Sequence, residues 1–377
     1  MHFDLDDEQR ELIRSARRFL REQAPSTKMR QWVETDEVLD PTIWRRMTEE
    51  LGWIGIPLPE KAGGFGFSWL DFALILEECG RALLPAPVWT SGALGAGSIL
   101  ELGTDAQIAD LLPDVAAGST IATLALTETG GKWNTDNLQT RATKDGDHYV
   151  LNGEKNYVPW AHVAGLFVVI ARDENNELVA FAVPKDTDGL TVTRLATMDM
   201  TRPQGTVTLT DVKLPQNARL SGAEDVDAAL AQALNRAAIL LSSELLGIAE
   251  ATMDISVEYA KERVQFGKPI GSFQAIKHKC ANMLMYVEAC RSAVWYAGWE
   301  ASQDDANLAE TAHVTKGFAS DIAYRNAADT IQVLGGIGIT WEHDAHFYFK
   351  RARASAQLLG NTSQHREALY QNIIAQS

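Results

Sequence analysis

The spacing of apolar residues changes twice along this chain of 377 residues, and this change constrains the fold more than any other feature. Up to about residue 118, apolar side chains recur every three or four positions, which indicates helices. Between residues 121 and 220 the period is two, as in the run from Leu178 to Val183, which indicates strands. The helical period then returns, and residues 227–263 keep it without a proline.

These periods predict an α+β chain. We expect an N-terminal helical domain over residues 1–118, a middle antiparallel β-barrel or sandwich over residues 119–222, and a C-terminal four-helix bundle over residues 223–377. Turn signals add detail. Asp40 and Pro41 predict the start of a helix, and Asn152 with Gly153 predicts a hairpin turn.

Charge and composition exclude several classes of protein. The chain has 34 Lys and Arg residues against 50 Asp and Glu residues, a formal net charge of -16, so we expect no nucleic-acid partner. No long apolar stretch is free of charge, so we expect no membrane span. The acidic N-terminus resembles neither a secretory signal nor a transit peptide, so we expect a cytoplasmic protein.

Cysteine and histidine spacing gives no sign of a metal site, and we expect no metal. The three cysteines, Cys79, Cys280 and Cys290, are an odd number without a CxxC pair. We expect buried thiols in a reducing compartment.

The segment from Glu258 to Gln274 carries the clearest chemistry. A long helix ends there, and a turn leads into the next helix, so Arg263, Phe266 and Gln274 meet at one corner. Such a corner can hold an anion and a flat ring, because arginine donates two hydrogen bonds to phosphate oxygens. The alternative is that Arg263 only favours the helix dipole and Phe266 only packs.

The segment that begins at Arg263 reads R-x-Q-F-G-x-P-I-x-x-F-Q, and it closely resembles the signature of the acyl-CoA dehydrogenase family. The resemblance covers most of the chain. Further matching segments are Leu58–Glu60 with Gly63–Gly66, Glu77–Arg81, Leu126–Glu128, Leu151–Lys155 and Gln332–Gly338.

This resemblance implies the cofactor FAD. In the family, the residues matching Arg263 and Gln274 help to hold the FAD pyrophosphate and adenosine across a subunit interface, with Phe266 beside them. The resemblance places the cofactor-binding residues Gln332, Gly335 and Gly336 near the same FAD, and it places Thr127 and Tyr157 at the isoalloxazine ring.

The resemblance also implies the reaction, oxidation of an acyl-CoA to its trans-2-enoyl-CoA with a glutamate as base. The family carries that base at one of two positions. Here these positions hold Leu359 or Gly360, depending on the alignment, and Asn235, so neither has a carboxylate.

Glu244 is the candidate substitute base, and Arg236 is the second candidate catalytic residue. The alternative for Glu244 is a buried carboxylate that is hydrogen-bonded within the bundle. Nine residues separate it from Asn235, which turns it about 180° around the helix from the family position.

The resemblance implies an FAD-dependent acyl-CoA dehydrogenase that works as a homo- or heterotetramer and passes electrons to an electron-transfer flavoprotein. Some actinobacterial members, which act on steroid side-chain CoA thioesters, pair a chain that has the base with a paralogous chain that lacks it. This sequence looks like the second kind. The alternatives are a non-catalytic, flavin-supporting subunit and a related flavin oxidase or monooxygenase.

Overall fold

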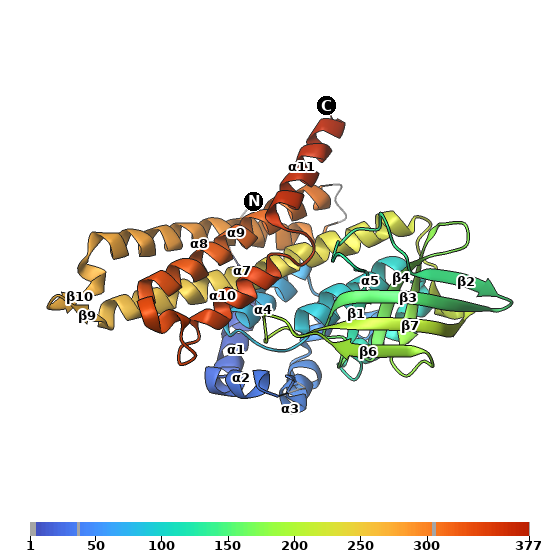
Figure 1. Cartoon of the computed structure of the whole chain (residues 1–377), viewed down its shortest axis with the longest axis horizontal. Helices are drawn as coiled ribbons and strands as arrows, with labels where there is room; N and C mark the ends of the chain where they lie inside the picture. The colour runs from blue at the N-terminus through green and yellow to red at the C-terminus, as the bar shows by residue number, and fades with distance from the viewer. Residues whose placement is uncertain (1–4, 36–37, 304–306, 377) are drawn as a thin grey trace. The chain divides into compact units, whose positions relative to one another are not determined.

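The computed structural model describes residues 5–35, 38–303 and 307–376 (Figure 1). The chain forms two compact units. Unit 1 comprises Met1–Glu34, Trp69–Pro85 and Ala238–Ser377, and unit 2 comprises Thr35–Ser68 and Ala86–Ala237.

Unit 1 is helical. Its elements are α1 (Asp7–Gln23), α2 (Ser26–Val33), α4 (Trp69–Arg81), most of α7 (Val226–Glu262), α8 (Gln274–Glu300), α9 (Leu308–Leu334), α10 (Ala345–Ser355) and α11 (Thr362–Gln376). Figure 1 shows α7, α8 and α9 as long helices, with the short strands β9 (Val264–Gln265) and β10 (Lys268–Pro269) joining α7 to α8. Buried apolar residues of α7, α8 and α9, among them Leu246, Val287 and Ala323, form one shared core.

Two glycines let α4 and α7 approach closely within unit 1. A Cβ atom added at Gly80 would lie 2.0 Å from the carbonyl oxygen of Glu244, and one added at Gly247 would lie 1.9 Å from that of Glu77. Any larger side chain at either position would push the two helices apart.

Unit 2 is built around an eight-stranded sheet in the order β6-β7-β3-β2-β4-β5-β8, with β1 paired to β4. The strands are β1 (Ala122–Ala125), β2 (Arg141–Asp145), β3 (His148–Pro159), β4 (Leu166–Arg172), β5 (Leu178–Pro184), β6 (Leu190–Arg194), β7 (Gln204–Pro215) and β8 (Arg219–Leu220). Helices α3 (Pro41–Arg45), α5 (Gly97–Leu102) and α6 (Asp105–Ala116) complete it, together with the first turns of α7.

The predicted fold class is confirmed, with one difference in the sheet. Its strands pair mostly in the antiparallel sense, but β1 and β2 each run parallel to β4, so the sheet is mixed. The helix start at Asp40 and Pro41 is also confirmed, because the Asp40 side chain accepts hydrogen bonds from the backbone of Thr42 and Ile43.

The predicted hairpin turn at Asn152 and Gly153 is wrong. Both residues lie inside β3, where the pairing with β7 shifts register. The Asn152 side chain spans this bulge by two hydrogen bonds to Asp211, of 3.0 and 2.8 Å. Glycine is needed because a Cβ at Gly153 would lie 2.6 Å from Thr140 Oγ1. The β2–β3 turn falls earlier, after Asp145.

Cys79 and Cys290 are buried free thiols, and Cys280 is half-buried. Within residues 5–35, 38–303 and 307–376, no helix combines the length and apolar character that crossing a membrane requires.

Candidate functional site

The corner between α7 and α8 is a tight hairpin that projects from unit 1. The carbonyl of Arg263 accepts a 2.8 Å hydrogen bond from the Ile270 backbone N–H, which closes the base of the hairpin. Phe266 and Gly267 form the two-residue loop with φ angles of 53° and 76°, the pattern of a type I′ turn. The Phe266 ring is 90% exposed and meets Phe273 only edge-on, with ring centroids 6.0 Å apart.

The first turn of α8 adds backbone donors to this corner. Gln274 is the first residue of the helix, and the preceding Phe273 offers no side-chain cap. The N–H groups at the start of a helix have no acceptor within the helix and carry a partial positive charge. Arg263 and Gln274 are both exposed beside them.

The glycine-rich turn after α9 lies at the same end of the bundle. An ion pair between Lys279, near the start of α8, and Asp329, near the end of α9, joins the two helix ends. Gln332 is exposed, and a Cβ added at Gly335 or Gly336 would meet no atom within 4 Å. The backbone here is therefore open to a ligand.

These features fit the group that the resemblance implies. FAD carries a pyrophosphate and two flat ring systems, and the corner offers an exposed guanidinium, an exposed aromatic ring and uncapped helix N–H groups. Arg263, Phe266 and Gln274 are all exposed, as a contact with a neighbouring subunit requires.

In unit 2, Thr127 and Tyr157 lie on adjacent segments. Asn156 N donates to Thr127 O over 2.8 Å, and the buried Thr127 hydroxyl donates to the Asn156 carbonyl. Tyr157 has φ 57° and is 45% exposed. Its ring is close to Gly131, where an added Cβ would lie 3.3 Å away.

A buried ion pair joins the two residues next to Thr127 and Asn156 in the chain. Lys155 Nζ donates to Glu128 Oε1 over 2.8 Å and to the Leu126 carbonyl over 3.2 Å. Burial lowers the pKa of Lys155 to about 8, and Glu128 partly offsets this. Burial opposes ionisation of Glu128, yet hydrogen bonds from Lys155, Thr140 and Gln139 hold its pKa below the ordinary value. Both residues belong to motifs of the sequence, but the ion pair between them was not predicted. Their opposite charges were the one feature of the sequence that could have indicated it.

The two family positions for the base carry no carboxylate in the structure. Gly360 has φ 102° and Leu359 has φ 59°, and the Gly360 carbonyl accepts a 3.3 Å hydrogen bond from the buried Lys316. Asn235 is half-buried on α7, and the adjacent Arg236 is ion-paired with Glu101 of α5. The structure brings Arg236 to a carboxylate partner that the sequence had not indicated.

Glu244 lies in the interior of unit 1. Its Oε1 accepts a 2.8 Å hydrogen bond from Arg351 Nε on α10, and the two side chains are only 3% and 4% exposed. A paired, buried carboxylate is poorly placed to take a proton from a substrate. The geometry therefore favours the alternative interpretation of Glu244, a structural carboxylate within the bundle.

Within the described residues, no group of three or more His, Cys, Asp or Glu side chains has the arrangement of a metal site.

Comparison with family profiles covers most of the chain. The profile of "Acyl-CoA dehydrogenase, N-terminal domain" matches residues 6–119, that of the middle domain matches residues 123–212, and that of the C-terminal domain matches residues 227–374.

Individual relatives agree with these matches. Acyl-CoA dehydrogenase IpdE2 of Mycobacterium tuberculosis is 33% identical over 357 residues, which cover 93% of each chain. A solved variant of the Tcur3481-Tcur3483 steroid ACAD is 32% identical, with a TM-score of 0.88 and coverage of 98% of each chain. The ChsE4-ChsE5 complex from Mycobacterium tuberculosis is 25% identical, with a TM-score of 0.89 and coverage of 99% of each chain.

Proposed function

Because this chain belongs to the acyl-CoA dehydrogenase family, we propose that it is the base-lacking subunit of an assembly whose paralogous chain carries the catalytic glutamate. The chain is an FAD-dependent oxidoreductase of the class that desaturates the α,β bond of acyl-CoA thioesters. Bound FAD supplies the hydride acceptor. We propose the kind of chain that is the partner and which of the two chains carries the catalytic base.

The backbone at Gly360 is the observation that carries this proposal. Its φ of 102° lies in a region that residues with a Cβ rarely adopt. A glutamate at this position would have to adopt an unfavourable backbone conformation, so the turn itself disfavours a base here. At the other family position, Asn235 cannot act as a base, and the nearby Glu101 is already ion-paired with Arg236.

The residues that this chain retains suit a supporting role. Arg263, Phe266, Gln274 and the turn over residues 332–336 would hold the pyrophosphate and adenosine of the partner chain's FAD. The resemblance assigns Thr127 and Tyr157 to a flavin ring in their own unit, but with one FAD per two chains that position would hold no flavin. Tyr157, which stands where the family usually has a tryptophan, is accordingly exposed.

Two partners follow from this role. We propose a heterotetramer with the paralogous dehydrogenase chain, since two similar structures, the Tcur3481-Tcur3483 steroid ACAD and the ChsE4-ChsE5 complex, each name two components. A steroid side-chain CoA thioester is the substrate class that the first of these names favours. An electron-transfer flavoprotein would then reoxidise the flavin.

The test is reconstitution. The chain is purified alone and together with a dehydrogenase-like chain encoded beside it, and turnover of straight-chain and steroid side-chain CoA thioesters is measured with an artificial electron acceptor. We expect little activity from the chain alone, at least a hundredfold more from the pair, and one FAD per two chains. High turnover by the isolated chain would disprove the base-lacking role. A reduced flavin that reacts rapidly with oxygen would instead indicate an oxidase or monooxygenase.

A further inference from the structure

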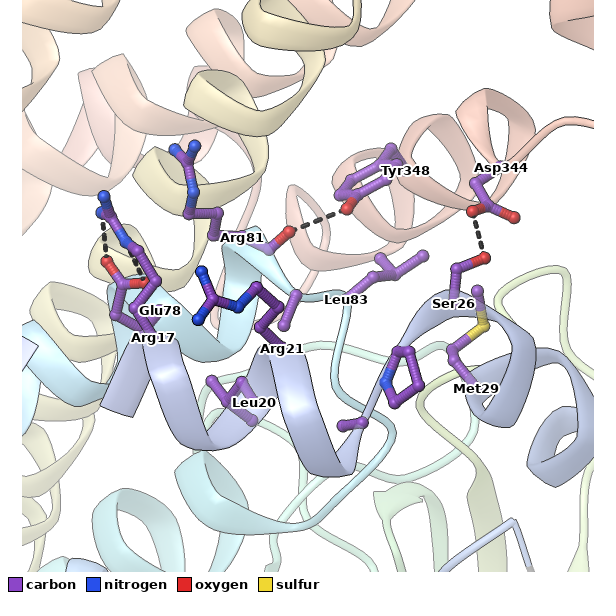
Figure 2. A pocket seen from close by; sticks show the side chains of 13 residues that line it. Arg17, Leu20, Arg21, Ser26, Met29, Glu78, Arg81, Leu83, Asp344 and Tyr348 are labelled. Carbon is purple, nitrogen blue, oxygen red and sulfur yellow. Dashed lines mark hydrogen bonds and ion pairs between the residues drawn. The ribbon is translucent and has the colours of Figure 1, made fainter. Parts of the chain in front are cut away.

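A cavity of about 390 Å³ opens in unit 1 between α1, α2, the C-terminal end of α4 and α10 (Figure 2). None of its lining residues belongs to the candidate site described above. Its volume lies within the range typical of pockets for small organic ligands.

The lining has two kinds of surface. Leu20, Ala24, Met29 and Leu83 are buried apolar residues that form part of the wall. Figure 2 shows Arg17, Arg21 and Arg81 gathered toward one end of the cavity, while Ser26 and Asp344 lie at the opposite end. The cavity is thus amphipathic along its length.

Most of the lining charges are already neutralised. Arg17 holds Glu78 by two hydrogen bonds, of 2.9 and 2.7 Å. Arg81 is ion-paired with Glu250 at 3.0 Å and with Asp254 at 2.5 Å. At the other end, Asp344 accepts hydrogen bonds from Arg30 and Ser26.

Arg21 differs from these residues. It lies on α1 one turn after Arg17, Figure 2 draws no interaction from it, and the described part of the chain provides no hydrogen-bond or ion-pair partner for its guanidinium. The cavity therefore combines one uncompensated cation with an apolar wall.

We propose that this cavity binds an amphiphilic monocarboxylate, with the carboxylate on Arg21 and the hydrocarbon part along Leu20, Ala24 and Leu83. A guanidinium binds a carboxylate through two parallel hydrogen bonds, and the apolar wall gains by covering a hydrocarbon chain. A neutral ligand would leave Arg21 unpaired. A second negative charge on the ligand would face Glu78 or Asp344.

Octanoate is the probe, titrated calorimetrically into the purified full-length chain. Octan-1-ol has the same chain without the charge, and acetate has the charge without the chain. The key variant is Arg21→Gln, and the matched control is Arg18→Gln, an exposed arginine of the same helix outside the lining. Arg21→Lys keeps the charge and loses the bidentate geometry.

We expect saturable binding of one octanoate per chain, at least tenfold weaker in Arg21→Gln, unchanged in Arg18→Gln and intermediate in Arg21→Lys. Octan-1-ol and acetate should each bind at least tenfold more weakly than octanoate. Octanoate could also enter the acyl-CoA site, but that binding would not depend on Arg21. Binding that is equal in Arg21→Gln and wild type, or an absence of saturable binding, would overturn the assignment.

Discussion

At the scale of single residues, Glu244 shows how burial separates two roles for one carboxylate. Its contact with Arg351 places both charges in the interior, where each is costly without the other. A catalytic base needs access to the substrate and a carboxylate free to take its proton. The pairing with Arg351 therefore favours a structural role for Glu244.

Glu244→Gln should therefore affect stability more than catalysis. We expect the substitution to remove the carboxylate charge that pairs with the buried Arg351 and to lower the free energy of unfolding by about 3 kcal/mol. Turnover of the reconstituted assembly should fall by less than tenfold. Thermal melting and steady-state kinetics measure the two effects, and a loss of turnover above a thousandfold with an unchanged melting temperature would identify Glu244 as the base.

At Gly360 the backbone conformation matters, whereas at Glu244 a side-chain contact does. We expect Gly360→Ala to cost about 1–2 kcal/mol, because φ 102° is unfavourable for a residue with a Cβ. Gly360→Glu should be destabilised at least as much and should not give the isolated chain dehydrogenase activity. Melting curves and an activity assay of both variants test this, and an active Gly360→Glu chain would contradict it.

At the scale of elements, α4 is anchored to its neighbours by buried charges. Glu77 accepts hydrogen bonds from Arg291 over 2.6 Å and from Trp295 over 3.0 Å, both on α8. The neighbouring Glu78 binds Arg17 of α1. One turn of α4 thus ties together two helices that lie far apart in the sequence.

This anchoring makes stability depend on pH. Burial raises the pKa of Glu77 to about 7, although Arg291 opposes the shift. Between its ordinary value of about 4.5 and about 7, the folded chain holds a proton that the unfolded chain has released. Stability should therefore fall as pH rises through this window, by up to about 3 kcal/mol from this group.

Glu77→Gln should remove this contribution and flatten the stability profile between pH 5 and 7. Glu22→Gln, an exposed glutamate of α1, is the control and should leave the profile unchanged. Melting temperatures across the pH range provide the measurement. A profile of Glu77→Gln as steep as that of the wild type would refute the assignment.

The β9–β10 hairpin carries a conformational cost that packing does not explain. Phe266 adopts φ 53° while its ring stays exposed, so the ring is held where a ligand can reach it. We expect Phe266→Gly to relieve about 1 kcal/mol of backbone strain and to lower the FAD content of the assembly. Phe266→Tyr keeps the ring and should retain FAD. Flavin absorbance per chain and melting temperature distinguish these outcomes.

At the scale of the whole molecule, the residues of unit 1 that we propose as cofactor contacts, Arg263, Phe266 and Gln274, are exposed on their own chain. Arg263→Gln should therefore leave the melting temperature of the isolated chain unchanged and reduce the flavin content of the assembly by at least half. Arg18→Gln, an exposed arginine of α1, is the matched control. Full flavin occupancy in the Arg263→Gln assembly would remove Arg263 from the cofactor site.

Much of this molecule is determined by local sequence. The two apolar periods predicted the helical and β regions, and the expected long helix over residues 227–263 differs from α7 by a single position at each end. The motif at Arg263 indicated the family and its cofactor. Residues close together in the chain carry these signals, because helix and strand periods and short motifs are local patterns.

Tertiary structure decided the rest, since it depends on partners distant in sequence. The Asn152–Gly153 pair signals a turn by itself, but pairing with β7 makes it a bulge. The sequence leaves Glu244 open as a base or as a buried structural carboxylate, and the contact with Arg351, 107 residues away, favours the second. The sequence places Leu359 or Gly360 at one family position of the glutamate, but only the φ of 102° in the folded turn shows that the backbone at Gly360 favours glycine.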